Sequence, residues 1–190
     1  EFRKVSASKL EKLIINELKP LKLDETRFRV TIDDLPESEW SSLGKDRVLF
    51  EVSTNKGMPF NLLSKIASGG ELSRFLLSLK LILVDSIPAV TMVFDEVDSG
   101  IGGSTARAVG ERLLKLSDNI QILVVTHSPQ VAAVGANHWH VFKVDKNNIK
   151  VTSAKHLDSS EREEEIARML SGIEVTDEAR AAALNLFEGK

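Results

Sequence analysis

The sequence predicts an α/β fold in which a mostly parallel sheet is flanked by helices. Two short apolar runs rich in β-branched residues, 90–94 and 120–126, are typical of buried parallel strands. The segment 72–84 is apolar nearly all round and 104–116 has one apolar face, so both are expected to be helices packed on the core. With 190 residues, of which 42% are apolar, the chain can bury one sizeable core. We therefore expect one domain with a smaller arm or lobe.

The N-terminal part of the chain predicts one helix and two half-exposed strands. Residues 4–18 carry leucine and isoleucine at helical spacing, and Pro20 ends that helix. An ordinary amphipathic helix and the last turns of a coiled coil both fit, because fifteen residues cannot establish a heptad repeat. In 28–32 and 48–52 apolar and polar residues alternate, as in strands with one exposed face. Trp40, in the loop between them, is expected to fold back onto the sheet.

The C-terminal part predicts a hairpin followed by two helices. Two strand-like runs within 139–153 flank a polar turn at 145–148. Both helices after it carry start and stop signals in the sequence. These signals are Ser160-x-x-Glu163 and Gly172 for the first helix, and Thr176 and Gly189 for the second.

Composition excludes several classes of protein. The chain has no cysteine, which fits a reducing compartment and excludes disulfides and thiolate metal sites. No apolar run approaches the length of a membrane-spanning helix and no signal peptide is visible, so a cytoplasmic location is expected. The net charge of −3 provides no general attraction to nucleic acid. Because the first residue is Glu rather than Met, we expect a fragment of a longer protein.

Two adjacent carboxylates, Asp95 and Glu96, directly follow the run 90–94. Ligands of open α/β sheets bind at the carboxyl ends of strands. Because side chains alternate along a strand, the two carboxylates can serve two tasks, one at a metal ion and one at a water molecule. Charges beside an apolar strand are costly unless a cation or a donor compensates them. A strand followed by an acidic, solvated turn is the alternative.

A glycine-containing segment, Ser68-Gly69-Gly70-Glu71, precedes the apolar helix 72–84. Ser-x-x-Glu is a capping box, so a helix start without any ligand is one interpretation. Two glycines weaken it, because each costs about 1 kcal/mol relative to alanine in a helix. Glycine allows close backbone approach and leaves N–H groups at the positive helix end, which suits a phosphate. We favour phosphate binding.

His127 ends the second apolar run, just before Ser128 and Pro129. Ser128 is a good N-cap and Pro129 fits the first position of a helix. A lone histidine is more often structural than catalytic. This one is expected at the end of a strand that neighbours the Asp95–Glu96 strand, which favours a functional role.

Two other patterns carry less weight. His138 and His140 share a strand face around Trp139, and an exposed face is favoured over a metal pair because no third ligand is evident. The segment Gly100-x-Gly102 lacks the third glycine of a dinucleotide-binding fingerprint, so that site is discarded.

Taken in order, the three segments resemble the C-terminal half of an ABC-type ATPase head. Ser-Gly-Gly-Glu, an apolar run ending in Asp-Glu and an apolar run ending in Thr-His match its signature motif, Walker B motif and switch histidine. The longer sequences around these motifs, 67–74, 94–102 and 125–132, resemble those of the RecN family of SMC-like ATPases. The resemblance covers about residues 50–170.

This resemblance implies a role for each candidate residue. Asp95 would orient Mg²⁺ through a water, Glu96 would polarise the attacking water, and His127 would sense the γ-phosphate in the same head. The segment 68–71 would close over ATP bound by the opposite head. The remaining candidates, Asp98, Ser99 and Gly100, would match the D-loop that meets the opposite head, although a solvated turn fits Ser99 equally well.

The phosphate-cradling motif Gly-x-x-x-x-Gly-Lys-[Ser/Thr] is absent from the sequence; Gly44-Lys45 is followed by Asp46. The resemblance implies that this motif lies in the N-terminal half of the head, so the fragment alone is expected to be inactive. Residues 1–20 would be a coiled-coil stub and 21–190 the C-terminal half of the head. The implied cofactors are ATP and Mg²⁺. The implied partners are the N-terminal half, a second head and, by resemblance only, DNA at double-strand breaks, with no membrane partner.

Two alternatives from other classes remain. One is a stand-alone metal-dependent phosphohydrolase that uses Asp95, Glu96, Asp98 and His127. The other is an interaction domain without enzymatic activity, whose acidic residues are solvated. A transporter subunit is less favoured within the ABC group, because the leading helix and the wording of the motifs point to the RecN family.

Overall fold

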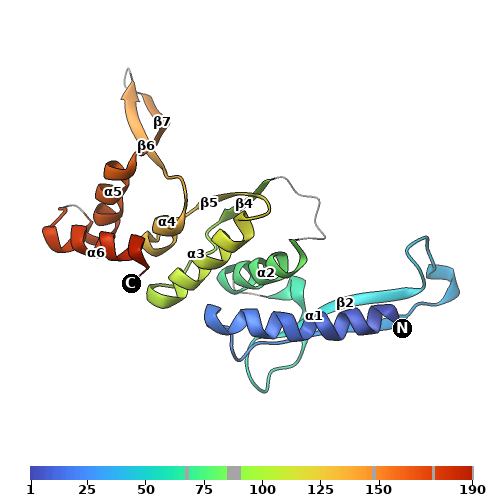
Figure 1. Ribbon diagram of the computed structural model, residues 1–190. Helices are drawn as coiled ribbons and strands as arrows, with labels where there is room; N and C mark the ends of the chain where they lie inside the picture. The colour runs from blue at the N-terminus through green and yellow to red at the C-terminus, as the bar shows by residue number, and fades with distance from the viewer. Residues whose placement is uncertain (67–68, 85–90, 147–148, 173, 190) are drawn as a thin grey trace.

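The computed structural model describes residues 1–66, 69–84, 91–146, 149–172 and 174–189. The chain runs from an N-terminal helix and antiparallel sheet, through two parallel strands with their helices, to a hairpin and two C-terminal helices (Figure 1). The α/β class with a parallel sheet and flanking helices is therefore confirmed. Within the described residues the parallel part has two strands, and the other two sheets are antiparallel.

The N-terminal unit is a three-stranded antiparallel sheet against which one helix packs. The strand order is β1-β2-β3, and Val30 of β1 lies opposite Phe50 of β2. Both predicted strands are confirmed. The elements are α1 (Phe2–Leu18), η1 (Lys19–Leu21), β1 (Arg27–Asp34), η2 (Glu37–Glu39), β2 (Asp46–Ser53), β3 (Asn61–Leu62) and η3 (Leu63–Lys65).

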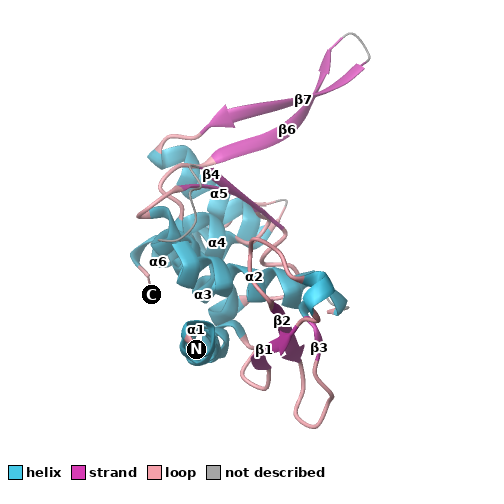
Figure 2. Cartoon of the chain, turned by 90° about the vertical axis from the view of Figure 1, so that its right-hand side faces the viewer, coloured by secondary structure: helices cyan, strands magenta, loops and turns pink. Residues whose placement is uncertain are grey.

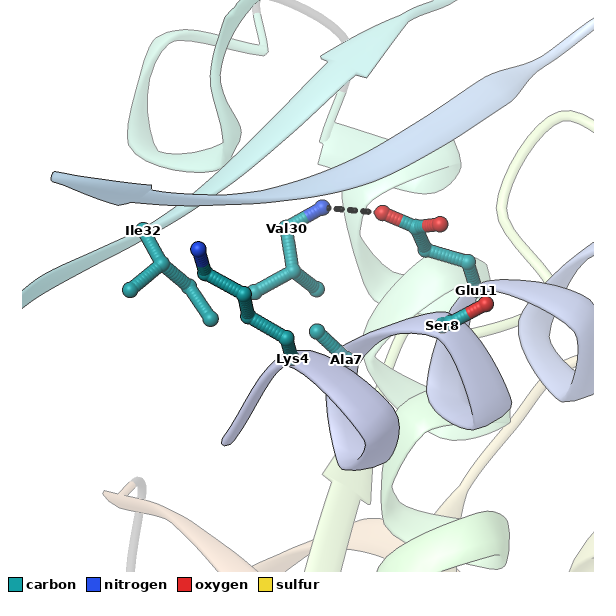
Figure 3. A pocket seen from close by; sticks show the side chains of 6 residues that line it. All are labelled: Lys4, Ala7, Ser8, Glu11, Val30 and Ile32. Atoms are coloured by element: carbon teal, nitrogen blue, oxygen red, sulfur yellow. Dashed lines mark hydrogen bonds between the residues drawn. The ribbon is translucent and has the colours of Figure 1, made fainter. Parts of the chain in front are cut away.

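Helix α1 is attached to the body mainly through its C-terminal half. Ile14 and Leu18 are fully buried in a cluster that includes Phe28 of β1. Nearer the N-terminus of the helix, the Glu11 carboxylate accepts a 2.7 Å hydrogen bond from the Val30 backbone N–H. There α1 and β1 face each other across a shallow groove (Figure 3). Phe2, at the start of α1, is 87% exposed. The helix thus begins in solvent and ends in the core.

Trp40 does not fold back onto the sheet. Its side chain is 52% exposed, and its indole N–H donates a 2.9 Å hydrogen bond to the Leu35 carbonyl. The expectation was wrong because the local loop satisfies the polar end of the indole and leaves the ring facing outward.

The central unit contains the two predicted parallel strands, joined by a helix. β4 and β5 pair in parallel, and Asp95 at the end of β4 lies opposite Val125 at the end of β5. Val90, the first residue of the predicted run, lies outside the described residues. The elements are α2 (Gly69–Leu83), β4 (Thr91–Asp95), α3 (Gly103–Ser117), β5 (Gln121–Val125) and α4 (Pro129–Val134).

The β4–β5 sheet is buried on one face only. Met92 and Phe94 point into a core formed with α2 and α3. On the opposite face Val93, Leu123 and Val125 are 62%, 50% and 59% exposed. The sequence indicated buried strands, and this holds for one face only, because no described element covers the second face.

The C-terminal unit is the predicted hairpin with two helices behind it. Its strands, β6 (Trp139–Lys146) and β7 (Ile149–His156), extend away from the body (Figure 2). Helices α5 (Ser159–Ser171) and α6 (Asp177–Glu188) pack against each other and against α4. The ends at Gly172 and Gly189 and the cap at Thr176 are confirmed.

The start of α5 differs from the prediction. Asp158, not Ser160, is the N-cap, and its carboxylate accepts a 2.8 Å hydrogen bond from the Glu161 backbone N–H. The Glu161 carboxylate reaches back to the Asp158 N–H at 3.2 Å, which completes the capping box. Two overlapping patterns of the same spacing stand in this segment, and the helix uses the one that begins with the stronger acceptor.

The helices in the described part of the chain are all too short or too polar to cross a membrane.

Candidate active site

The two carboxylates end one parallel strand, and the candidate histidine follows its neighbour. Asp95 is the last residue of β4 and Glu96 follows it, while His127 lies two residues beyond the end of β5. Because Asp95 is level with Val125, Glu96 and His127 lie at the same edge of the sheet. The three side chains are exposed, and none makes a hydrogen bond or ion pair with the described residues. The predicted neighbourhood of carboxylates and histidine is therefore present.

Glu96 has a left-handed backbone conformation, with φ of 53°. A residue with a side chain adopts this conformation at a cost of roughly 1–2 kcal/mol. The turn that holds it is closed by a 3.0 Å hydrogen bond from the Ser99 N–H to the Glu96 carbonyl. Backbone strain of this kind gathers at functional sites, where the surroundings impose it.

Asp98 is not in a solvated turn. The side chain is 1% exposed, and its Oδ2 accepts a short hydrogen bond from the Thr126 hydroxyl. Its Oδ1 is buried without a hydrogen-bond partner among the described residues. The neighbouring Ser99 is half-buried and Gly100 is exposed, with a φ of 72°. Of the three predicted D-loop residues, two thus remain available to a partner.

The backbone on both sides of His127 is held by its neighbours. The Thr126 hydroxyl accepts a 2.9 Å hydrogen bond from the Ser128 backbone N–H. Ser128 is 7% exposed and is the N-cap of α4, with Pro129 at the first helical position, as predicted. The imidazole of His127 thus projects from a fixed turn between a strand and a helix.

The N-terminus of α2 lies against the loop that follows β4. A methyl group added to Gly70 would approach the Ser99 carbonyl oxygen to 3.0 Å, whereas one added to Gly69 would meet nothing within 4 Å. A side chain at position 70 would therefore press against the loop, whereas position 69 is open. Ser68 lies outside the described residues, and Glu71 stands in the first turn of the helix. The first N–H groups of a helix have no partner within it, so this end remains suited to an anion.

Arg74 is a residue of this site that the sequence analysis did not single out. It is 8% exposed, and its Nε has no hydrogen-bond partner within the described part of the chain. Burial lowers the pKa of its guanidinium, and Glu71 partly opposes that effect. A charged residue within the almost wholly apolar helix 72–84, one turn after Gly70, was the available signal.

The site suits a single-carboxylate magnesium site better than a metal cage. The described residues contain no cluster of three or more histidine or acidic side chains able to hold a metal ion. Mg²⁺ usually binds through one or two carboxylates, retained waters and substrate phosphates. An exposed carboxylate without a protein partner, such as Asp95, fits that pattern.

His138 and His140 do not lie on the exposed face that the sequence favoured. Both are half-buried, and Nε2 of His140 lies 4.0 Å from a carboxylate oxygen of Glu165 on α5. Nδ1 of His138 is buried without a partner in the described residues. Burial, together with the nearby Arg162, lowers the pKa of His138, while Glu165 opposes this. The hairpin was expected to be free on this side, but α5 packs against its base.

Relatives of this chain are DNA repair proteins of one kind. It is 42% identical to DNA repair protein RecN of Rickettsia bellii over 185 residues, which cover 97% of this chain and 33% of that protein. It is 39% identical to RecN of Vibrio cholerae over 181 residues (95% and 32%) and 49% identical to RecN of Xylella fastidiosa over 147 residues (76% and 26%). No protein-family model matches. The chain spans about a third of the length of the curated relatives it matches.

Solved structures with a similar fold are SMC heads. The Smc head domain of Pyrococcus yayanosii, solved with a coiled coil and joint, matches 90% of this chain and 30% of its own length with a TM-score of 0.62 and 17% identity. A chain solved in work on ATP-driven dimerisation and DNA-stimulated activation of SMC ATPases matches 90% of this chain and 96% of its own length, with a TM-score of 0.52 and 15% identity. At these identities the matches establish the fold. The resemblance predicted from three motifs is confirmed.

Proposed function

This chain is a RecN-type sequence with the fold of part of an SMC head, and on that premise we propose that it is the C-terminal half of an ATPase head that acts in DNA double-strand break repair. Its place would be cytoplasmic, at the nucleoid. ATP would be hydrolysed at the face between two heads. The observation that carries this proposal is the common sheet edge at which Glu96 and His127 lie, together with the contact between the loop that follows Glu96 and the start of α2.

Each residue at this edge has a proposed task. Glu96 polarises the attacking water, and its strained backbone holds the carboxylate outside the strand. His127 contacts the γ-phosphate of the same head from its fixed turn. The segment 68–71 presents backbone N–H groups to ATP bound by the opposite head. Ser99 and Gly100 face that head beside it.

Asp95 is the residue proposed to hold Mg²⁺ through a water molecule. When bound, this ion would neutralise charge on the phosphates of ATP. Asp95 itself fixes the orientation of the ion's water shell, and it can do so because its carboxylate is exposed at the end of β4.

The exposed apolar face of β4 and β5 supports the proposal that the N-terminal half of the head is a partner. Three aliphatic side chains at half exposure or more stand side by side there: Val93, Leu123 and Val125. Full burial of an exposed aliphatic side chain contributes about 1.5–3 kcal/mol, so covering the exposed half of one contributes roughly half of that. The N-terminal half would close this face and bring the phosphate-cradling lysine to the edge where Asp95 and Glu96 lie.

A stand-alone phosphohydrolase is less well supported. That alternative needs Asp98 as a ligand, but the Asp98 carboxylate is buried against Thr126 and does not reach the exposed edge.

Glu96→Gln in the protein that carries both halves of the head provides the test. Removing a general base lowers the rate of hydrolysis by about 10²–10⁴-fold. ATP binding and ATP-driven association of heads should persist, because the amide has the same shape. Glu163→Gln, at an exposed position on α5, is the matched control and should hydrolyse ATP at the wild-type rate. If Glu96→Gln hydrolyses ATP as fast as this control, the proposed role of Glu96 is wrong.

A further inference from the structure

The carboxylate of Asp98 is buried beside the site with a single hydrogen bond to the described residues. A carboxylate without water around it is costly unless hydrogen bonds compensate for the loss. Asp98 is 1% exposed and receives one described hydrogen bond, from Thr126, while its other oxygen has none. A side chain in that position contributes little as packing, so its role depends on what its single hydrogen bond holds in place.

That bond leads directly to the turn that carries His127. The Thr126 hydroxyl donates a hydrogen bond to the Asp98 carboxylate and accepts one of 2.9 Å from the Ser128 backbone N–H. The two residues adjacent to His127 are therefore tied together and to the loop after β4. With its donor and acceptor both occupied, the hydroxyl has one orientation, and so has the backbone between Thr126 and Ser128.

The same loop touches the start of α2. Ser99, which follows Asp98, places its carbonyl oxygen so close to Gly70 that a methyl group there would lie 3.0 Å from it. The pair Asp98–Ser99 thus contacts the phosphate-facing helix end on one side and the histidine turn on the other. Glu96 lies two residues before Asp98 in the same strained turn.

We propose that Asp98 is a positioning residue which, through the Thr126 hydroxyl, fixes His127 relative to Glu96 and links the start of α2 to the histidine turn within one head. This inference rests on the proposed function. Asp98 itself touches no nucleotide. A displacement of the loop by an opposite head at Ser99 would reach His127 through this pair of hydrogen bonds.

Thr126→Val in the protein with both halves of the head is the first test. Valine has the shape of threonine but removes both hydrogen bonds. The expected result is a loss in kcat of up to about 100-fold, as for a misplaced catalytic group, with the KM for ATP unchanged. Thr126→Ser restores the hydroxyl, and kcat should return to near the wild-type value. Equal rates for Thr126→Val and wild type would overturn the proposal, as would a Thr126→Ser variant as slow as Thr126→Val.

A double-substitution cycle separates positioning through Thr126 from an independent role of Asp98. If Asp98 acts through the threonine hydroxyl, Asp98→Ala combined with Thr126→Val should lower kcat no further than the more damaging single change. A loss equal to the product of the two single losses would mean that the residues act independently and would overturn the proposal.

A measurement without nucleotide distinguishes this inference from the proposed function. Hydrogen–deuterium exchange of a peptide that spans 124–130 should accelerate in Thr126→Val and in Asp98→Ala, and remain at the wild-type rate in Thr126→Ser. Unchanged exchange in Thr126→Val would refute the link itself. If the variants exchange as expected but the wild-type protein does not hydrolyse ATP, the proposed function is refuted and the link between Asp98 and Thr126 remains established.

Discussion

At the scale of single residues, the proposed function depends on backbone positions as much as on side chains. Glu96 has the left-handed conformation that glycine usually occupies, and Gly70 is the position where a side chain would crowd the Ser99 carbonyl. Glu96 carries the proposed general base, and Gly70 lies where α2 contacts the loop after β4. The left-handed backbone of Glu96 sets the direction of its carboxylate, and the missing side chain of Gly70 permits the close contact with Ser99.

The strain at Glu96 can be measured as stability. Glu96→Gly and Glu96→Ala both remove the carboxylate, but only glycine adopts a φ of 53° without steric cost. The gain of roughly 1–2 kcal/mol from relief of strain is reduced by the greater chain entropy of glycine in the unfolded state. Urea unfolding should therefore show Glu96→Gly to be more stable than Glu96→Ala by about 0.5–1 kcal/mol. The reverse order would mean that the turn imposes no strain.

The residue scale also shows where sequence patterns stop being informative. Asp95, Glu96 and His127 were recognisable because each follows a strand-like run. The burial of Asp98 was not, because its partner Thr126 lies 28 residues away and nothing local distinguishes a buried aspartate from a solvated one. Arg74 was missed for a similar reason, since its burial depends on packing between elements.

At the scale of elements, the two neighbouring parallel strands and most helix ends were predictable, and burial was not. Continuous apolar runs identified both parallel strands, and the spacing of apolar residues identified the apolar side of α3. Whether the second face of β4 and β5 is covered depends on the segment that packs there, and the apolar sequences of the two strands carry no information about that segment. The cap of α5 was misassigned by two residues because two patterns with the capping-box spacing overlap.

The open face of β4 and β5 yields a prediction about assembly. Leu123→Lys places a charge on this face at a side chain that is 50% exposed, so it should change the stability of the chain alone by no more than about 0.5 kcal/mol. It should weaken binding of a separately produced N-terminal half by about tenfold or more, since roughly 1 kcal/mol of apolar burial is lost and the lysine ammonium would have to be buried in the contact. Isothermal titration calorimetry of the two halves measures this.

The control for that experiment is Val141→Lys on the hairpin. Val141 is 63% exposed and lies on a different sheet, so the substitution has the same chemistry and should leave binding unchanged. Equal loss of binding in both variants would place the contact elsewhere.

The base of the hairpin yields a prediction about pH. Burial lowers the pKa of His138 below its ordinary value of 6.5, so the unfolded chain binds more protons than the folded one as the pH falls below 6.5. The free energy of unfolding should decrease from pH 6.5 downward until the folded-state histidine protonates. Glu165, whose pKa is lowered by its hydrogen bond with Arg168, loses its contribution only below its ordinary value of 4.5. The His138 effect therefore begins at a higher pH than the Glu165 effect.

His138→Gln tests this assignment because it removes the titrating group and keeps a polar side chain of similar reach. Thermal unfolding between pH 7 and 5 should show a smaller decrease in stability for the variant than for the wild type. Identical slopes would show that another group is responsible.

At the scale of the whole molecule, the chain contains one edge of the proposed active site and one sheet face that no described element covers. The edge contains the carboxylates and the histidine, with the start of α2 against the adjoining loop, and the uncovered face lies on the same two strands. Both features are explained together if the head is completed by another segment and the active site by another head. The sequence alone predicted this through a missing phosphate-cradling motif, and the open face is the independent structural support for it.

The last prediction concerns which head each group serves. Gly69→Asp is the suitable probe, because a side chain there meets nothing within 4 Å, whereas one at Gly70 would displace the Ser99 carbonyl and confuse folding with function. If α2 closes over ATP of the opposite head, Gly69→Asp should leave ATP binding to single complete heads intact and block their ATP-driven association. The introduced carboxylate would face the γ-phosphate of that ATP, and two like charges about 4 Å apart repel by roughly 4 kcal/mol at an effective dielectric constant near 20. Size-exclusion chromatography with and without Mg-ATP, alongside Gly69→Ala as the uncharged control, measures the outcome. A head carrying Gly69→Asp that fails to bind ATP on its own would assign this helix end to the same head's nucleotide, and normal association by that variant would remove it from the interface.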